Sequence, residues 1–488
     1  MKFKVYKNGK ADTSFKLAGA YMFGTDDVAI RRVEITCKDG VINCAKPSNE
    51  TAGLSLLWTI EGYGSVQLST TCLPEREKPY ILNLELARAK LMQIVTKQQE
   101  WSLFADTNEL EKSINQAKQL FIDAIDNISE PSKSAQLADK SLYKSTILSE
   151  KLTQRHSDKL FITKSKNHLF SRGCLGCKIE PKMLQNSAYG KAVLELFGFV
   201  TIPVNWAKIE KQRDEYDFTE LDACIKTFSN KKVGIGAGPL LKFNTAYLPD
   251  WLIEEKPNFQ KVLEYAYEFI NQVVTRYSRF VRLWKVLGGL NCYNCFGFNF
   301  EQTLEMSRAS VMAVRNSTER AIKLIELANP WGEYYAAKSA TVPPIVYVDM
   351  LIQSGIGFDA FGLDLRFGKS PGCVKLRDMM NISSILDCFS GIAKPVHITE
   401  FSLESQSQKG KDSEQFGWWQ EDWNPQTQAK WIQQFYKIAL AKPFVDTVTY
   451  SSVADSRKNG ESGLLDKNMK PKQAYESIKN TNKLIFKR

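Results

Sequence analysis

The stretch PVHITEFSLES, residues 395–405, reads as a buried strand whose apolar run ends in a charged residue. Val396, Ile398 and Thr399 are strand-forming residues, and Glu400 follows them directly. A short apolar run without strict polar alternation is typical of a parallel strand that is covered on both faces. The stretch therefore predicts one strand of a parallel sheet, with a carboxylate near its carboxyl end.

Similar runs recur outward from this stretch, between about residue 169 and the C-terminus, and helical patterns separate them. The eight predicted strands are Phe170–Cys174, Gly198–Ile202, Val233–Leu240, Phe280–Leu287, Pro330–Tyr335, Phe358–Leu365, Pro395–Glu400 and Thr447–Ser452. The predicted helices include Pro181–Phe197, Phe259–Tyr277, Glu301–Ala328 and Gln426–Ala441. Eight β/α units predict an α/β fold, a (β/α)8 TIM barrel, with functional residues at the carboxyl ends of its strands.

Two segments of different character precede the barrel. Residues 1–78 contain short β-forming runs between turn signals and predict a β-sandwich-like module. Its predicted strands are Phe3–Tyr6, Ala18–Phe23, Ile30–Thr36, Leu54–Ile60 and Ser65–Thr70. Residues 79–160 have apolar residues at helical spacing and predict a helical connecting segment, which leaves residues 161–488 for the barrel.

The helical segment carries a regular apolar seam, made of Leu110, Ile114, Ala117, Phe121, Ala124 and Ile128. An amphipathic stripe of this width usually packs on the rest of its own chain. We therefore expect the segment to dock on the barrel, and the alternative is a homo-oligomer interface formed by the same seam.

Composition narrows the class of protein. The net charge is +11 over 488 residues, but the lysines are scattered and no nucleic-acid-binding motif is present, so we expect no specific nucleic acid partner. No run of 18 apolar residues occurs, which predicts no membrane-spanning helix. The N-terminus MKFKVYKNGK lacks the apolar core of a secretory signal, so we expect a cytoplasmic protein with reduced thiols.

Four of the ten cysteines form two CxxC pairs, Cys174 with Cys177 and Cys292 with Cys295. Two such pairs can together hold zinc or an iron–sulfur cluster. Compact zinc modules, however, separate their pairs by about 15–20 residues, far fewer than here. We expect no shared metal site and no cofactor, although a metal at these pairs stays open.

From the second strand onward, six stretches resemble motifs of glycoside hydrolase family 10 in the family's order. The second strand and its loop, FGFVTIPVNWAKIEKQRDEYDFTELDACI (197–225), resemble the family's E-N-E-M-K-W strand with its G-x-[FY]-D-F-x-x-x-D turn, and Trp206, Tyr216-Asp217-Phe218 and Asp222 hold those places. The others are VGIGAGPLLKFNTAYLPDWL (233–252), VRLWKVLGGLN (281–291), FDAFGLDLRFG (358–368), PVHITEFSLES (395–405) and GLLDKNMKPKQAYESI (463–478). The resemblance implies the family's barrel over about residues 170–485 and a retaining glycosidase, usually one that acts on xylan.

The resemblance also shows what this chain lacks. Retaining hydrolysis needs a nucleophile and a proton donor. Glu400 matches the family's nucleophile in T-E-L-D, but aligning Trp284 with the tryptophan of W-D-V-V-N-E puts Gly289 at the proton donor. The family's third-strand histidines are also missing, because no histidine occurs between residues 169 and 396.

Several residues are candidates for a site at the barrel mouth. Glu400 is the candidate nucleophile, and a structural ion pair with Arg366 or Lys285 is the alternative. Asp364 and Arg366 stand two apart on the sixth strand and therefore point to the same side. The remaining candidates for ligand binding are Trp284, Lys285, Glu333 at the end of the fifth predicted strand, and Trp418 with Trp419 as an aromatic sugar platform that alternatively caps the barrel.

These observations favour a family member that binds a polysaccharide or oligosaccharide, or acts as a scaffold, without ordinary xylan hydrolysis. The second hypothesis is an active glycosidase that has rebuilt its proton donor from Asp364 or Glu333. The third is a structural or assembly protein whose barrel packs against partners.

Overall fold

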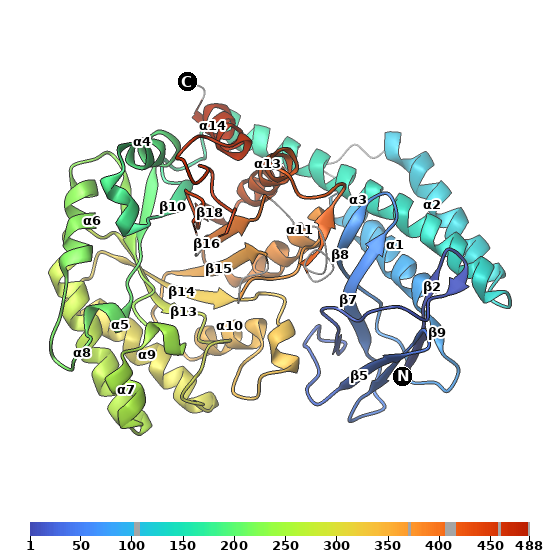
Figure 1. Ribbon diagram of the computed structural model, residues 1–488, viewed down its shortest axis with the longest axis horizontal. Helices are drawn as coiled ribbons and strands as arrows, with labels where there is room; N and C mark the ends of the chain where they lie inside the picture. The colour runs from blue at the N-terminus through green and yellow to red at the C-terminus, as the bar shows by residue number, and fades with distance from the viewer. Residues whose placement is uncertain (102–107, 369–371, 406–415, 457–459, 487–488) are drawn as a thin grey trace.

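We describe the protein from a computed structural model, which covers residues 1–101, 108–368, 372–405, 416–456 and 460–486. Eight parallel strands close into a barrel in chain order (Figure 1). They are β10 (Leu175–Lys178), β11 (Phe199–Ile202), β12 (Gly234–Ala237), β13 (Leu283–Gly288), β14 (Ile322–Ala328), β15 (Ala360–Phe367), β16 (Val396–Leu403) and β18 (Val445–Tyr450). The predicted (β/α)8 barrel is confirmed.

Helices cover the outside of the barrel. The longer ones are α4 (Ser187–Leu196), α6 (Thr219–Ser229), α8 (Phe259–Tyr277), α9 (Phe300–Ser317), α10 (Pro344–Gln353), α11 (Met379–Cys388), α13 (Pro425–Ala441) and α14 (Gln473–Phe486). The short ones are η1 (Pro181–Gln185), α5 (Trp206–Ile209), η2 (Thr245–Tyr247), α7 (Asp250–Glu255), η3 (Glu333–Ala336) and η4 (Ser390–Ile392). The helix predicted at Phe259–Tyr277 coincides with α8, whose start is capped by the Asn258 side chain.

Two of the predicted strands were misplaced. The fifth strand is Ile322–Ala328, so its prediction at Pro330–Tyr335 is wrong, and so is the extension of the preceding helix through Ala328. The first strand begins at Leu175, directly after the predicted run. The fifth strand was missed because a short apolar run fits a buried strand and a buried helix equally well, whereas the first strand is shifted along the chain by a few residues.

The barrel interior is filled, with an apolar floor below a polar layer. Leu283, Leu324 and Ala360 form the floor together with Phe199, whose ring occupies the space that a side chain at Gly236 would need. The inward positions that follow on β13 and β14 are Lys285 and Glu326, both buried. A barrel of eight strands has room for such layers and leaves no pore.

The N-terminal sheet module is present as two four-stranded sheets and a small hairpin. Strands β5 (Glu34–Lys38), β6 (Val41–Ala45), β1 (Lys2–Lys4) and β9 (Tyr80–Ile81) form one sheet. The other contains β8 (Gly64–Ser69), β7 (Gly53–Ile60), β4 (Tyr21–Phe23) and β17 (Trp418–Trp419), and the hairpin pairs β2 (Tyr6–Lys7) with β3 (Lys10–Ala11). Strand β17 belongs to the loop that follows β16, so the barrel itself completes this sheet.

Three helices connect the module to the barrel. They are α1 (Leu82–Glu100), α2 (Asn108–Asp126) and α3 (Pro131–Lys166), and α3 extends roughly 54 Å at 1.5 Å per residue. Along this length α3 contacts the module at one end and α11, α13 and α14 at the other (Figure 1). Leu110, Ile114 and Ala117 of the seam pack inside the chain with Leu148 and Leu152. Whether the segment also forms an oligomer, and whether the chain divides at 78 and 160, stay predictions.

A buried carboxylate joins the three parts. Glu150 of α3 accepts hydrogen bonds from the Tyr63 hydroxyl at 2.6 Å, the Met379 amide at 3.0 Å and the Trp419 indole at 3.3 Å. Burial raises the pKa of Glu150 to about 7, although the hydrogen bonds from Tyr63 and Met379 oppose the shift. The Glu150 carboxyl group therefore titrates near neutral pH, at a point where the module, the helices and the barrel meet.

No helix in the described part of the chain is long and apolar enough to cross a membrane.

Candidate functional site

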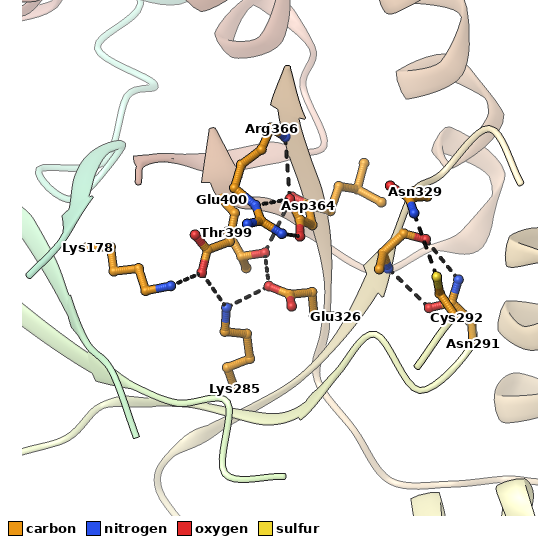
Figure 2. Close-up of polar contacts among 12 residues, drawn as sticks. Lys178, Lys285, Asn291, Cys292, Glu326, Asn329, Asp364, Arg366, Thr399 and Glu400 are labelled. Atoms are coloured by element: carbon orange, nitrogen blue, oxygen red, sulfur yellow. Dashed lines mark hydrogen bonds and ion pairs between the residues drawn. The ribbon is translucent and has the colours of Figure 1, made fainter. Parts of the chain in front are cut away.

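Five strands of the barrel bring charged side chains together at its carboxyl end (Figure 2). They contribute Lys178, Lys285, Glu326, Asp364 with Arg366, and Glu400 from β10, β13, β14, β15 and β16 respectively. The strand register places Ala328, Asp364 and Glu400 side by side, and Glu326 pairs with Gly362, two residues earlier. Glu326 therefore lies one layer deeper in the barrel than Glu400.

Glu400 is held by two lysines. Its Oε1 accepts a hydrogen bond from Lys178 Nζ at 2.6 Å and another from Lys285 Nζ at 3.3 Å, and the residue is 5% exposed. Burial alone would raise its pKa, but Lys178, Lys285 and Arg366 outweigh burial and hold the pKa of Glu400 well below its usual range. Glu400 is thus a carboxylate at neutral pH, as a nucleophile must be, but its charge is already neutralised by ion pairs.

Lys285 is the centre of the deeper layer. Its Nζ donates to Glu326 Oε2 at 2.6 Å as well as to Glu400, and both Lys285 and Glu326 are 2% exposed. Thr399 Oγ1 donates to the same oxygen of Glu326 at 2.5 Å, which Gly362 permits because a side chain there would strike Thr399. Burial would lower the pKa of Lys285, but Glu326 and Glu400 reverse this and raise it. Lys285 therefore stays charged and links the two carboxylates.

Asp364 and Arg366 pair with each other. The guanidinium donates to Oδ1 of Asp364 at 2.8 Å and to Oδ2 at 2.5 Å, a bidentate arrangement. Burial opposes the charge on Arg366, yet Asp364 keeps its pKa raised. The prediction that the two residues share a side of the strand agrees with this geometry, and the pairing uses both oxygens of the carboxylate.

Gly289, which the family resemblance puts at the proton donor, has no room for a side chain. It follows β13 directly, has a φ of +63°, and a Cβ there would lie 2.7 Å from Ala328 Cβ and 2.9 Å from Tyr293 Cδ2. Real Cβ atoms do not approach other atoms this closely. The space that a proton donor would enter is occupied by Tyr293 and Ala328.

Three residues of the mouth were absent from the sequence prediction. Lys242 and Tyr247 follow β12 and Tyr293 follows β13, and all three are half-buried. The Lys242 ammonium lies 4.8 Å from the Tyr247 ring centre and 4.5 Å from that of Tyr293. The adjacent charge of Lys178, followed by that of Lys242, lowers the pKa of Tyr247, although burial and Glu400 oppose this. Their position directly after a barrel strand is the sequence signal that could have identified them as residues of the mouth.

The remaining candidates lie away from this group. Trp284 is fully buried, and its indole nitrogen has no hydrogen-bond partner among the described residues. Glu333 was expected at the end of a strand, which is wrong: it lies in η3 and accepts from Arg377 Nη2 at 3.1 Å. Trp418 and Trp419 pair with β8 of the module, and Trp419 is 1% exposed. Trp419 is therefore buried between the module and the loop after β16, and the role of Trp418 and Trp419 in binding a sugar stays a prediction.

The N-terminal module contacts three consecutive loops at this end of the barrel. After β14, the Arg31 guanidinium donates to Thr341 O at 2.8 Å and lies 3.7 Å from the Tyr335 ring centre. After β15, Gln67 N donates to Leu376 O at 2.8 Å, and after β16 the loop forms β17. The mouth is thus bounded by the module on the side of β14, β15 and β16.

The CxxC cysteines do not form a recognisable metal centre. Cys177 is buried in β10, Cys292 is buried after β13, and burial raises the pKa of both thiols. Lys338 and Asn329 point donors at Cys292 Sγ, at 3.7 and 3.6 Å (Figure 2 shows Asn329). Across the described ranges, no three histidine, cysteine, aspartate or glutamate residues gather as metal ligands would. The absence of a shared metal stays a prediction.

Two comparisons place the barrel among known proteins. A family model of glycosyl hydrolase family 10 matches residues 165–481, well over half of the chain. Xylanase 10B from Thermotoga maritima is similar in structure, with a TM-score of 0.51 and 16% identity, over 67% of this chain and 99% of that one. A family 10 protein from Paenibacillus barcinonensis has a TM-score of 0.51 and 15% identity, over 65% and 97% of the two chains.

Xylanase 10B from Thermotoga petrophila RKU-1, solved with xylobiose, has a TM-score of 0.50 and 16% identity, over 65% of this chain and 95% of that one. No curated protein matches the chain. At such identities the structural likeness shows the fold alone, whereas the family model spans most of the barrel. This chain belongs to glycosyl hydrolase family 10.

Proposed function

We propose that this chain binds a carbohydrate at the barrel mouth and does not hydrolyse xylan by the retaining mechanism. The observation that carries the proposal is the lack of room at Gly289, where Ala328 and Tyr293 occupy the direction a proton donor would take. An unactivated sugar departs as a poor leaving group unless it is protonated as the bond breaks, and general acid catalysis supplies about 10²–10⁴-fold. A chain without a proton donor lacks this rate enhancement.

The ion pairs of Glu400 support the same proposal. A nucleophile attacks with the oxygen lone pairs that face the sugar, and Oε1 of Glu400 is engaged by two ammonium groups. These contacts lower the basicity of the carboxylate, as its depressed pKa reflects. They also fill the space beside it, since Lys178 extends from β10 past the intervening strand β18 to reach Glu400.

Ligand binding rests on the aromatic and polar groups of the mouth. Tyr247 and Tyr293 are half-buried and stand beside Lys178 and Lys242. Ring faces of this kind pack on the apolar faces of a pyranose, and the Lys178 ammonium is placed to donate to its hydroxyls; small-molecule sites combine the same elements.

The second candidate is an active glycosidase that has rebuilt its proton donor, and Glu326 is the residue that favours it. Glu326 and Glu400 both lie within 3.3 Å of Lys285 Nζ, so two carboxylates share one small volume. Against this candidate, Glu326 is 2% exposed and one layer deeper, where it accepts from Lys285 and Thr399. Asp364 is fully paired, and Glu333 lies outside the mouth.

The experiment compares unactivated xylan with an activated aryl xyloside, in the wild type and in Glu400→Ala. An activated leaving group departs without protonation, so slow aryl turnover that disappears in Glu400→Ala agrees with the proposal. Xylan cleavage that disappears in Glu400→Ala would overturn it and favour Glu326 as the donor.

Calorimetric titration with xylo-oligosaccharides measures the binding half of the proposal. Loss of binding in Tyr247→Ala and Tyr293→Ala supports a site at the mouth. Absence of any carbohydrate binding would instead favour the structural or assembly hypothesis, with the module and the barrel loops as the organising contact.

A further inference from the structure

The mouth holds more positive charge than its carboxylates neutralise. Lys178, Lys285 and Arg366 are taken up by Glu400, Glu326 and Asp364. Lys242 and Lys338 have no carboxylate within ion-pair distance among the described residues, and their ammonium groups lie beside the rings of Tyr247 and Tyr293 and the thiol of Cys292.

These two lysines converge on one place. Lys242 Nζ lies 4.5 Å from the Tyr293 ring centre and Lys338 Nζ lies 5.4 Å from it, although one lysine follows β12 and the other follows η3. Arg366 borders the same ring, because a Cβ at Gly372 would lie 2.5 Å from the Tyr293 hydroxyl and 3.5 Å from Arg366 Nη2. Three cationic side chains thus surround Tyr293, and Lys178 and Lys242 stand beside Tyr247.

Lys242 is half-buried and Lys338 is exposed. Both ammonium groups lie within 5.4 Å of the centre of the Tyr293 ring, and like charges gathered around one ring repel each other, more so where water is partly excluded. The depressed pKa of Tyr247, with Lys178 as its largest cause, reports positive charge beside that neighbouring ring of the mouth. A ligand with a negative group would relieve this repulsion.

Resting on the proposed carbohydrate binding, we propose that the mouth selects acidic sugars, with Lys242 and Lys338 receiving a carboxylate or a sulfate ester of the ligand beside the ring of Tyr293. The ring packs against the sugar while the lysines bind its anionic group. Lysine suits this task because its ammonium is a compact charge with three donors on a flexible stem. Neutral xylo-oligosaccharides fill the same site without using these two charges.

The test uses the full chain and three probes of equal backbone length: an unsubstituted xylo-oligosaccharide, the same oligosaccharide with one glucuronic acid branch, and a sulfated one. Calorimetric titration at low salt is expected to show about tenfold tighter binding for at least one acidic probe than for the neutral one. The two acidic probes distinguish the carboxylate source from the sulfate source. The preference shrinks as salt screens the charges.

The variants distinguish the effect of these two lysines on binding from the effect of the overall net charge. Lys242→Gln with Lys338→Gln is expected to abolish the acidic preference and leave neutral binding within about twofold, since neither lysine makes an ion pair with any residue that the structure describes. Lys231→Gln with Lys232→Gln is the matched control, because both lysines are exposed and precede the strand β12 that Lys242 follows. This control removes two charges at the opposite end of the barrel and is expected to change nothing.

The outcomes distinguish the two proposals. Equal binding of neutral and acidic probes overturns the acidic preference and leaves carbohydrate binding standing. A preference that survives in the double variant places the anion site elsewhere and overturns the assignment to these lysines. Failure of all three probes to bind contradicts carbohydrate binding itself, and the acidic preference falls with it.

Discussion

A single methyl group at Gly289 tests whether this position can hold any side chain. In Gly289→Ala the new Cβ lies 2.7 Å from Ala328 Cβ and 2.9 Å from Tyr293 Cδ2. A non-glycine residue at a φ of +63° costs about 1–2 kcal/mol, and overpacking of this kind costs about 1–3 kcal/mol more. We expect a total loss of about 2–5 kcal/mol in the free energy of unfolding.

Gly297 offers the matched control, because it has a φ of +68° and a Cβ there meets nothing within 4 Å. Gly297→Ala is therefore expected to lose only the conformational cost of about 1–2 kcal/mol. The measurement is guanidinium unfolding of both variants and the wild type, followed by tryptophan fluorescence. If Gly289→Ala is no less stable than Gly297→Ala, the space beside Gly289 is open and the steric argument is wrong.

The same geometry predicts how a proton donor must be restored. Gly289→Glu alone is expected to remain inactive on xylan, since its side chain meets Tyr293. Gly289→Glu with Tyr293→Ala removes the obstructing ring and is the fairest attempt to regain cleavage that depends on Glu400. Robust xylan cleavage by the single variant would refute the view that Tyr293 and Ala328 exclude a donor.

Three further predictions concern buried charges. Lys285→Met should lose about 3–5 kcal/mol of stability because it leaves Glu326 and Glu400 without their buried partner. The Lys178 side chain is 23% exposed, so Lys178→Met should lose less than about 1 kcal/mol. Equal losses of the two variants in chemical denaturation would contradict this. Lys178→Met should also raise the pKa of Glu400, since it removes the largest opposing charge, and a carbon-13 NMR titration that shows no upward shift would count against the ion pair. The pKa of Glu150 is about 7 in the folded chain, against an ordinary value of 4.5, so its contribution to stability is complete below about pH 4.5 and is lost as the pH rises through 7. This corresponds to a fall of about 3 kcal/mol in the free energy of unfolding, which we expect Glu150→Gln to remove. A variant whose stability depends on pH as that of the wild type does would exclude Glu150 as the source.

The sequence by itself predicted the barrel and some of the residues at its mouth. Eight apolar runs with helical spacers lead to the fold, because parallel strands buried on both faces leave that pattern whatever their detailed sequence. Glu400, Lys285, Asp364 and Arg366 were named from the family motifs and from their places near strand ends, and these places are at one end of such a barrel. The loss of the proton donor at Gly289 could also be predicted from the sequence, but only because the family motif aligns with this stretch.

Tertiary structure alone decided which of these groups meet. Glu326 was missed because its strand reads equally well as the end of a helix, and Glu333 took its place in the prediction for the same reason. Lys178 pairs with Glu400 across 222 residues of chain, and Trp419 joins a sheet whose other strands lie near the N-terminus. Local patterns report periodicity and burial, whereas such contacts depend on how distant segments pack, and only the folded chain brings those segments together.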